Sequence, residues 1–143
     1  MKSEIMQKIL TRQFFQRPTL KVAQKLLGKV LVIGNCSGRI NEVEAYIGQN
    51  DPACHACLSG RQACRGQTDR NKPMFGESGH LYIYFCYGMY HCANIVTEKK
   101  GFPAAILLRS VEPIKEIKSM EKRRGRKDHL ADGPGKLCIA LGM

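Results

Sequence analysis

The chain has 143 residues, and its 23 Lys and Arg against 12 Asp and Glu give a formal net charge of +11 at pH 7. Such a charge favours a polyanion such as nucleic acid as the partner. The sequence has neither an apolar run long enough to cross a bilayer nor an N-terminal signal peptide. We therefore expect no membrane partner and an intracellular location, in a bacterial cytoplasm or a eukaryotic nucleus.

The first predicted elements are a helix and a pair of strands. Apolar residues recur at helical spacing over residues 18–28, between Thr19 as the expected N-cap and Gly28 as the terminating glycine. Strands over residues 29–33 and 39–46 follow, and the glycine-bounded loop between them has the length of a hairpin connection. We expect the helix to pack on a sheet that begins with this hairpin.

The second of these strands carries acidic side chains. Side chains alternate along a strand, so Glu42, Glu44 and Tyr46 share one face, and the small apolar residues between them face the core. The loop that follows carries His55. A carboxylate, an aromatic ring and a histidine suit a catalytic site, whereas an ordinary solvent-facing strand with two acids explains the strand equally well.

A second hairpin is predicted over residues 80–96, where two β-rich runs flank Tyr87 and Gly88. Glycine lets the backbone reverse there without a steric penalty, which puts Tyr87 at or near the tip. On a basic protein an aromatic side chain at a hairpin tip can act as a wedge that unstacks bases. The commoner arrangement folds such a ring back onto the core.

The remaining predicted elements are a strand over residues 104–108, a helix over about 114–124, and a loop at 133–136 that opens a short final helix. Residues 115–127 contain seven Lys or Arg and two Glu. Such a run is either a solvated face or a source of sequence-independent phosphate contacts, and the pattern favours neither interpretation.

Seven motifs along the chain resemble, in the same order, those of the alkyladenine (3-methyladenine) DNA glycosylase family. They span nearly the whole sequence, and an ordered set of this kind is far more specific than a single pattern. The motifs are residues 42–46 (EVEAY), 51–55 (DPACH), 70–71 (RN), 74–76 (MFG), 82–94 (YIYFCYGMYHCAN), 108–113 (LRSVEP) and 133–137 (GPGKL).

The resemblance implies a mixed α/β (α+β) fold in which residues 1–143 form a single domain, with a curved antiparallel sheet, packed helices and a protruding DNA-intercalating β-hairpin. It also implies a base-excision-repair enzyme that hydrolyses the N-glycosidic bond of an alkylated purine, such as 3-methyladenine, flipped out of duplex DNA. The expected partner is double-stranded DNA containing alkylated bases. The protein is expected to act as a monomer and without a cofactor.

Carried over to this chain, the resemblance assigns catalysis to Glu44, as the carboxylate that activates water, and to Arg109, near that water. An ionised carboxylate suits the reaction because the sugar gains oxocarbenium character as the bond breaks. Tyr46, His55 and Tyr84 are assigned to the pocket that encloses the extruded base. A cationic alkylated purine between aromatic rings gains about 0.5–2 kcal/mol that a neutral base does not.

Four further residues receive roles in the same way. Asn94 matches the asparagine beside the base pocket that excludes the amino group of guanine. Tyr87 matches the intercalating tyrosine of the hairpin. Met74 and Arg70 are expected to contact DNA. A Schiff-base lyase would need a lysine beside the sugar. Lys72, between two of the motifs, is better suited to a phosphate contact or a solvated position, so we expect a monofunctional hydrolase.

Two other classes of function remain open. The short Cys54–Cys57 spacing, with Cys64 and the His91–Cys92 pair elsewhere, permits a zinc site and hence a zinc-dependent nucleic-acid-binding module. A glycosidase using two carboxylates, Glu42 and Glu44, fits less well, because glycosidases place these groups on opposite sides of the bond.

The sequence departs from the family pattern in two places. The segment 56–69 is several residues longer than the pattern, so the loop near the pocket is expected to be reshaped. The chain ends at Met143, where family members continue, so we expect a C-terminally short member of lower stability with weak or no turnover. A catalytically weakened remnant of a glycosylase is therefore a further alternative.

Overall fold

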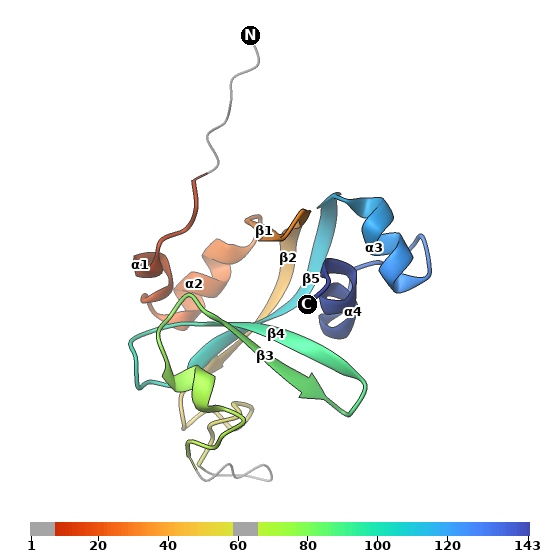
Figure 1. The fold of residues 1–143 in the computed structure, drawn as a ribbon. Coiled ribbons are helices and arrows are strands. Elements are labelled where there is room, and N and C mark those ends of the chain that lie inside the picture. Colours follow the sequence, from red (N-terminus) through yellow and green to blue (C-terminus); the bar gives the residue numbers. More distant parts are fainter. Residues whose placement is uncertain (1–7, 59–65) are drawn as a thin grey trace.

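The computed structural model describes residues 8–58 and 66–143, which fold around a five-stranded antiparallel sheet of order β1-β2-β5-β4-β3. Figure 1 shows β2 and β5 side by side, with the β3–β4 hairpin crossing below them and reaching out at the lower right. The strands are β1 (Val30–Ile33), β2 (Cys36–Ile47), β3 (Leu81–Cys86), β4 (Tyr90–Val96) and β5 (Ala104–Lys115). The helices are α1 (Arg12–Phe15), α2 (Thr19–Leu26), the 3-10 turn η1 (Lys72–Phe75), α3 (Ile117–Arg124) and α4 (Pro134–Leu141).

The two faces of the sheet carry different hydrophobic clusters. The larger cluster joins one sheet face to α2 and α4, and includes Val22, Leu26, Ile106, Leu108 and Leu137. The smaller cluster lies on the opposite face and is closed by the segments before β3; its buried members are Cys54, Ala56, Met74, Tyr82, Val96 and Ala105. The predicted α+β class, antiparallel sheet and projecting hairpin are confirmed. No helix in the described parts of the chain is long and apolar enough to span a bilayer.

The start of α2 differs from the prediction that Thr19 is its N-cap. Pro18 occupies that position, and Thr19 is already the first helical residue. Its backbone N–H and its hydroxyl both donate to Oε1 of Glu98, at 2.9 and 2.8 Å. A carboxylate from a distant turn thus accepts the N-terminal hydrogen bonds of the helix, an interaction that a local capping pattern cannot reveal.

Two element boundaries predicted from the sequence are also wrong. β2 begins at Cys36, so only Gly34 and Asn35 connect it to β1. β5 continues to Lys115, well beyond the predicted end at residue 108, and α3 begins at Ile117. The helix is predicted to start at about residue 114, but pairing with β2 keeps Lys115 extended, in register with Ser37. Tertiary pairing has overridden local propensity here.

The edge strands β1 and β3 both border an apolar groove. The groove has a volume of about 640 Å³, and its lining includes Leu31 and Val32 of β1, Leu81 of β3, and the core residues Leu26 and Ile95. Its lining contains no carboxylate and no histidine. The catalytic candidates lie on the other face of the sheet, so this groove is not the candidate site.

The capping contact of α2 can be tested by substitution. We expect Glu98→Ala to lower the free energy of unfolding by about 1–2 kcal/mol, because two donors of Thr19 lose their acceptor. Chemical denaturation measures this change. Glu77→Ala is the matched control, since the exposed 3.5 Å pair of Glu77 with Arg12 should be worth no more than about 0.5 kcal/mol. Equal effects of the two substitutions would contradict the capping role.

Candidate active site

Glu44 lies at the centre of a hydrogen-bonded group on β2 and β5. Nη1 of Arg109 donates to Oε2 of Glu44 at 2.9 Å, and the hydroxyl of Tyr46 donates to Oε1 at 2.6 Å. Nε of Arg109 donates to Oε1 of Glu42, also at 2.9 Å. The predicted shared face of Glu42, Glu44 and Tyr46 is therefore confirmed by contact, and the structure brings Arg109 to the same place.

Two hydrogen-bond donors hold the carboxylate of Glu44. Glu44 is flanked by the guanidinium of Arg109, whose pKa is raised first by its hydrogen bond to Glu42. Burial, followed by the bond to Glu44, raises the pKa of Tyr46, so its hydroxyl stays protonated and donates. A carboxylate that accepts bonds from both neighbours is fixed in orientation, as a general base should be.

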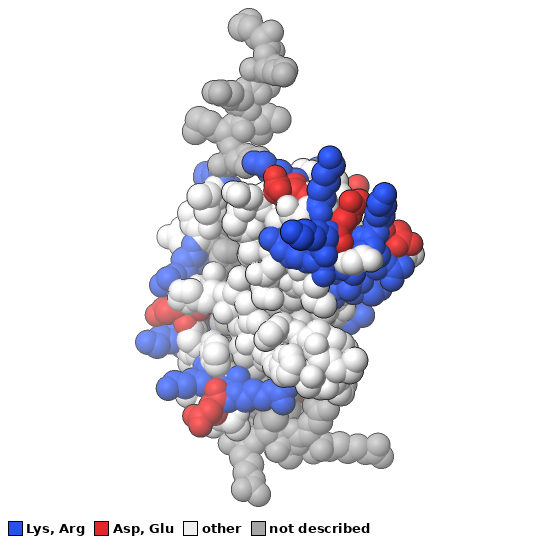
Figure 2. All heavy atoms as spheres, turned by 45° about the vertical axis from the view of Figure 1, so that its right-hand side comes forward, with Lys and Arg blue, Asp and Glu red and all other residues white. Residues whose placement is uncertain are grey.

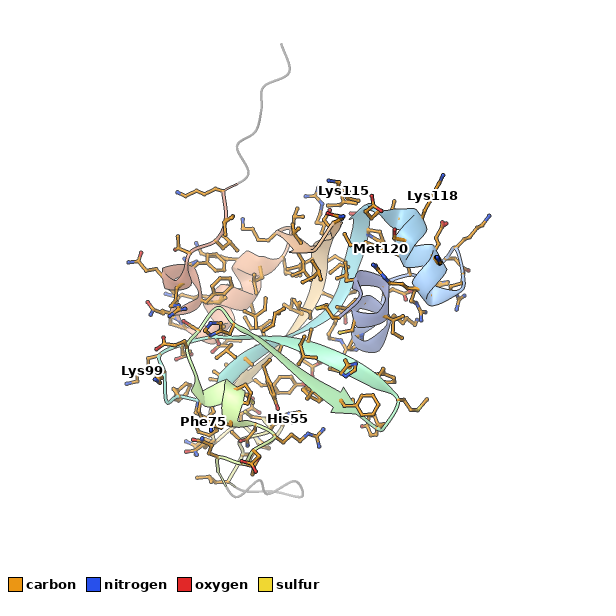
Figure 3. All side chains as sticks on the ribbon, viewed as in Figure 1. His55, Phe75, Lys99, Lys115, Lys118 and Met120 are labelled. Atoms are coloured by element: carbon orange, nitrogen blue, oxygen red, sulfur yellow. The ribbon has the colours of Figure 1, made fainter. Side chains whose placement is uncertain are left out.

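Beside Glu44, Tyr46 forms one wall of a small pocket that is lined by Tyr46, His55, Met74, Tyr82, Tyr84 and Asn94. The ring of His55 meets that of Tyr84 edge to face, with centroids 4.6 Å apart, and its Nδ1 lies 3.4 Å from the hydroxyl of Tyr82. Figure 3 shows His55 below the β3–β4 hairpin, near Phe75. The pocket thus gathers four of the predicted residues: Tyr46, His55, Tyr84 and Asn94.

The pocket is closed and uncharged apart from its rim. Its volume of about 10 Å³ is room for a water molecule at most. Burial, with a smaller effect of the Arg70 charge, lowers the pKa of His55, so the imidazole is neutral at pH 7. A neutral ring is suited to a cationic guest, which an imidazolium would repel.

The loop that presents His55 is held by a buried asparagine. Nδ2 of Asn71 donates to the backbone carbonyls of His55, at 3.0 Å, and of Gly66, at 2.9 Å. Its Oδ1 accepts from the backbone N–H of Thr68 at 2.7 Å. Asp51 stabilises the start of the same loop by accepting from the N–H of Ile47. Asn71 therefore acts on the pocket through the position of His55.

The hairpin tip presents Tyr87 to solvent. Its side chain is 85% exposed, so it does not fold back onto the core. The backbone of Tyr87 has φ +51°, a left-handed conformation that a residue with a side chain adopts only at a cost. Tyr87 and Gly88 are the central residues of the turn closed by the bond from the N–H of Met89 to the carbonyl of Cys86, and positive φ at both positions is the pattern of a type I′ hairpin turn.

The two predicted DNA contacts differ in exposure. Arg70 is exposed, lies over the ring of Tyr84 at 5.4 Å and donates to the carbonyl of Phe85. Met74 was expected to contact DNA and therefore to lie at the surface. It is only 2% exposed and lines the pocket instead. The apolar Met74 side chain packs with the second cluster, among Tyr82 and Val96, which accounts for its burial.

Two residues of the site received no role from the sequence. Tyr82 is buried and lines the pocket, and its alternation with Tyr84 along β3 was the available signal. Asn71 stands next to Arg70 in one of the motifs, but its three bonds reach across a loop and leave no local pattern. Asn94 lines the pocket as predicted and donates to the carbonyl of Tyr82 at 3.2 Å.

The proposed zinc ligands are only partly placed. Cys54 and Cys57 are buried, and Cys64 lies outside the described residues. Within residues 8–58 and 66–143, no three side chains of His, Cys, Asp or Glu come close enough to hold a metal ion.

The sequence matches the methylpurine-DNA glycosylase family over residues 13–143. The chain belongs to this family. Proteins of Methanocella arvoryzae and Chlorobaculum tepidum, each named "Putative 3-methyladenine DNA glycosylase", are 52% and 50% identical to it over 94% and 95% of its length. A protein of the same name from a Wolbachia of Brugia malayi is 51% identical over 94%. The chain spans 68%, 65% and 70% of the length of these three relatives.

The role of Asn71 in this glycosylase-family fold is testable. We expect Asn71→Asp to lower the free energy of unfolding by about 3 kcal/mol, because it replaces two donated hydrogen bonds by a carboxylate facing two carbonyls. Asn50→Asp makes the same chemical change at an exposed position of the preceding turn and should have little effect. Chemical denaturation measures the free energy of unfolding of both variants. Equal values for the two variants would show that Asn71 does not hold the loop.

Proposed function

We propose that this chain is a base-excision-repair DNA glycosylase that hydrolyses the N-glycosidic bond of alkylated purines flipped out of duplex DNA. Membership of the methylpurine-DNA glycosylase family supports the class of reaction. The observation that carries the assignment is the hydrogen-bonded Glu44, held by Arg109 and Tyr46 at the edge of an aromatic pocket. The enzyme is monofunctional, acts as a monomer and works inside the cell, where its DNA substrate lies.

Recognition of the base uses the aromatic pocket. A base inside a duplex is out of reach, so the enzyme extrudes the nucleotide and fills the gap that it leaves. The exposed ring of Tyr87 fills the gap, and the extruded base enters between Tyr46, His55 and Tyr84. Purines alkylated at N3 or N7 are cationic, and the tyrosine rings attract that charge. Asn94 lies in the same pocket. It discriminates against guanine by excluding the amino group of that base.

Hydrolysis requires a base and an electrostatic partner on the sugar side. As the C1′–N bond breaks, its electron pair leaves with the purine and positive charge develops on the sugar. Glu44 stabilises that charge and accepts a proton from the water that adds to C1′. Both oxygens of Glu44 already accept hydrogen bonds, from Tyr46 and Arg109, so the water gains its place when Tyr46 moves.

The closed pocket makes base binding a gated step. A purine is far larger than the space of about 10 Å³, so the rings of Tyr46, His55 and Tyr84 must separate. The same movement of Tyr46 breaks its 2.6 Å bond to Glu44. Entry of a base and release of one carboxylate oxygen are therefore coupled through a single side chain.

Positive charge lies where flanking duplex can reach it. Figure 2 shows Lys and Arg gathered over the upper part of one face, and Figure 3 places Lys115 and Lys118 at the α3 end of the molecule, away from His55. At 3.3 Å per residue, Lys115 is about 20 Å along β5 from Arg109, or some six base pairs of duplex. The exposed members of this basic surface are Lys115, Lys118, Lys122, Arg123, Arg126 and Lys127.

Not every residue of this basic surface is available to DNA. Arg123 donates to the carbonyl of Ala140, and Arg126 pairs with Asp128 at 2.9 Å. The better phosphate contacts are Lys115 on β5, Lys118 and Lys122 on α3, and Lys127 after α3. Their contribution is sequence-independent and falls with salt concentration.

The role of Glu44 has a direct test. We expect Glu44→Gln to reduce release of free base from methylated duplex DNA by at least about a hundredfold, because the amide neither accepts a proton nor stabilises positive charge. Duplex binding should stay within a few-fold, since shape and positive charge are retained. Single-turnover kinetics measure the rate of base release, and a binding titration measures the affinity for duplex DNA. A variant that keeps the wild-type rate would refute the proposed function.

The wedge has its own test. Tyr87→Ala should weaken binding to lesion-containing or abasic duplex much more than binding to undamaged duplex, because the ring acts only when a nucleotide is out of the stack. Tyr87→Phe keeps the ring and should bind both duplexes like the wild type. Parallel titrations compare the three proteins, and equal losses on both duplexes after Tyr87→Ala would exclude the wedge.

A further inference from the structure

Arg109 binds two carboxylates rather than one. Its Nε donates to Oε1 of Glu42 and its Nη1 donates to Oε2 of Glu44, each at 2.9 Å. The proposed chemistry uses Glu44 and leaves Glu42 without a role. The Glu42 side chain is 57% exposed, so its ion pair with Arg109 adds little to folding stability. A function for Glu42 must therefore come from what it does to Arg109.

The backbone gives Arg109 an unusual setting. In the ladder between β2 and β5, Glu42 pairs with Ser110 and Val43 pairs with Leu108, so Arg109 is passed over. It is the extra residue of a β-bulge, a feature that redirects side chains next to functional sites. A long side chain at a bulge has many rotamers. The bond from Nε to Glu42 selects one of them.

Without Glu42, the guanidinium of Arg109 would bind Glu44 in a different geometry. A planar guanidinium commonly grips one carboxylate through two parallel bonds. Such a grip would place an N–H of Arg109 on each oxygen of Glu44, including Oε1, the oxygen that Tyr46 now contacts. With Glu42 present, Arg109 reaches Oε2 alone, and Oε1 accepts only from Tyr46 among the described residues.

Glu42 also sets the local charge. Two carboxylates and one guanidinium leave one net negative charge beside the pocket. With Glu42 removed, Glu44 and Arg109 would form a neutral pair, and the attraction for positive charge on the sugar would fall.

We propose that Glu42 is a positioning residue, which holds Arg109 side-on so that the guanidinium binds a single oxygen of Glu44 and leaves the other for water. The role rests on the proposed function, because it concerns the same carboxylate.

The test compares three variants with the wild type. Glu42→Gln should lower the single-turnover rate of base release from methylated duplex DNA about ten- to a hundredfold, as expected for a misplaced catalytic group, with duplex binding and thermal stability unchanged. Glu112→Gln is the matched control, because it removes the same charge from an exposed pair with Arg39 on the same two strands. That control should keep the wild-type rate.

A double substitution then shows whether Glu42 acts through Arg109. In an Arg109→Leu background, Glu42→Gln should cost much less than in the wild type, because only the direct effect of its charge remains. The same fold-loss in both backgrounds, or a full rate for the single Glu42→Gln variant, would overturn the proposal. The result for Glu44→Gln is independent: if it is inactive while Glu42→Gln is active, only the positioning role fails, whereas an active Glu44→Gln variant refutes the function itself.

Discussion

The pairing of β2 with β5 is the constraint on which the rest of the structure depends. It runs from Ser37 opposite Lys115 to Ile47 opposite Ala104. Alternation along these strands sends aliphatic side chains into the core beneath α2 and α4, and sends Glu44 and Arg109 to the other face. A slip by one residue would bury the carboxylates and expose the core, so the hydrophobic pattern enforces the register that builds the site.

The bulge at Arg109 shows how a local irregularity serves that register. A regular ladder would alternate without interruption past Arg109, whereas the observed one skips this residue and resumes at Ser110. The guanidinium reaches Glu42 and Glu44 on the neighbouring strand from this position. The ladder also skips Asn41, which lies between Ile40 opposite Val111 and Glu42 opposite Ser110, so an irregularity lies on each side of the Glu42–Ser110 pair.

Period-two alternation was enough to predict that Glu42, Glu44 and Tyr46 share a face, because this property is local. The same holds for Tyr87, whose place at the tip follows from the glycine beside it. Features that depend on partners distant in sequence were missed: the acceptor for Thr19 is Glu98, and the support for His55 is Asn71. The length of β5 was missed for the same reason, since its last residues are extended only because they pair with β2.

Charge distribution connects the site to the rest of the molecule. The chain carries a net charge of +11, which attracts phosphate at long range. Glu42 and Glu44 are a local exception, and two adjacent acids would repel the DNA backbone if nothing bridged them. Arg109 bridges both and leaves a single negative charge at the pocket edge. The pocket edge is therefore locally negative on a protein whose net charge is positive.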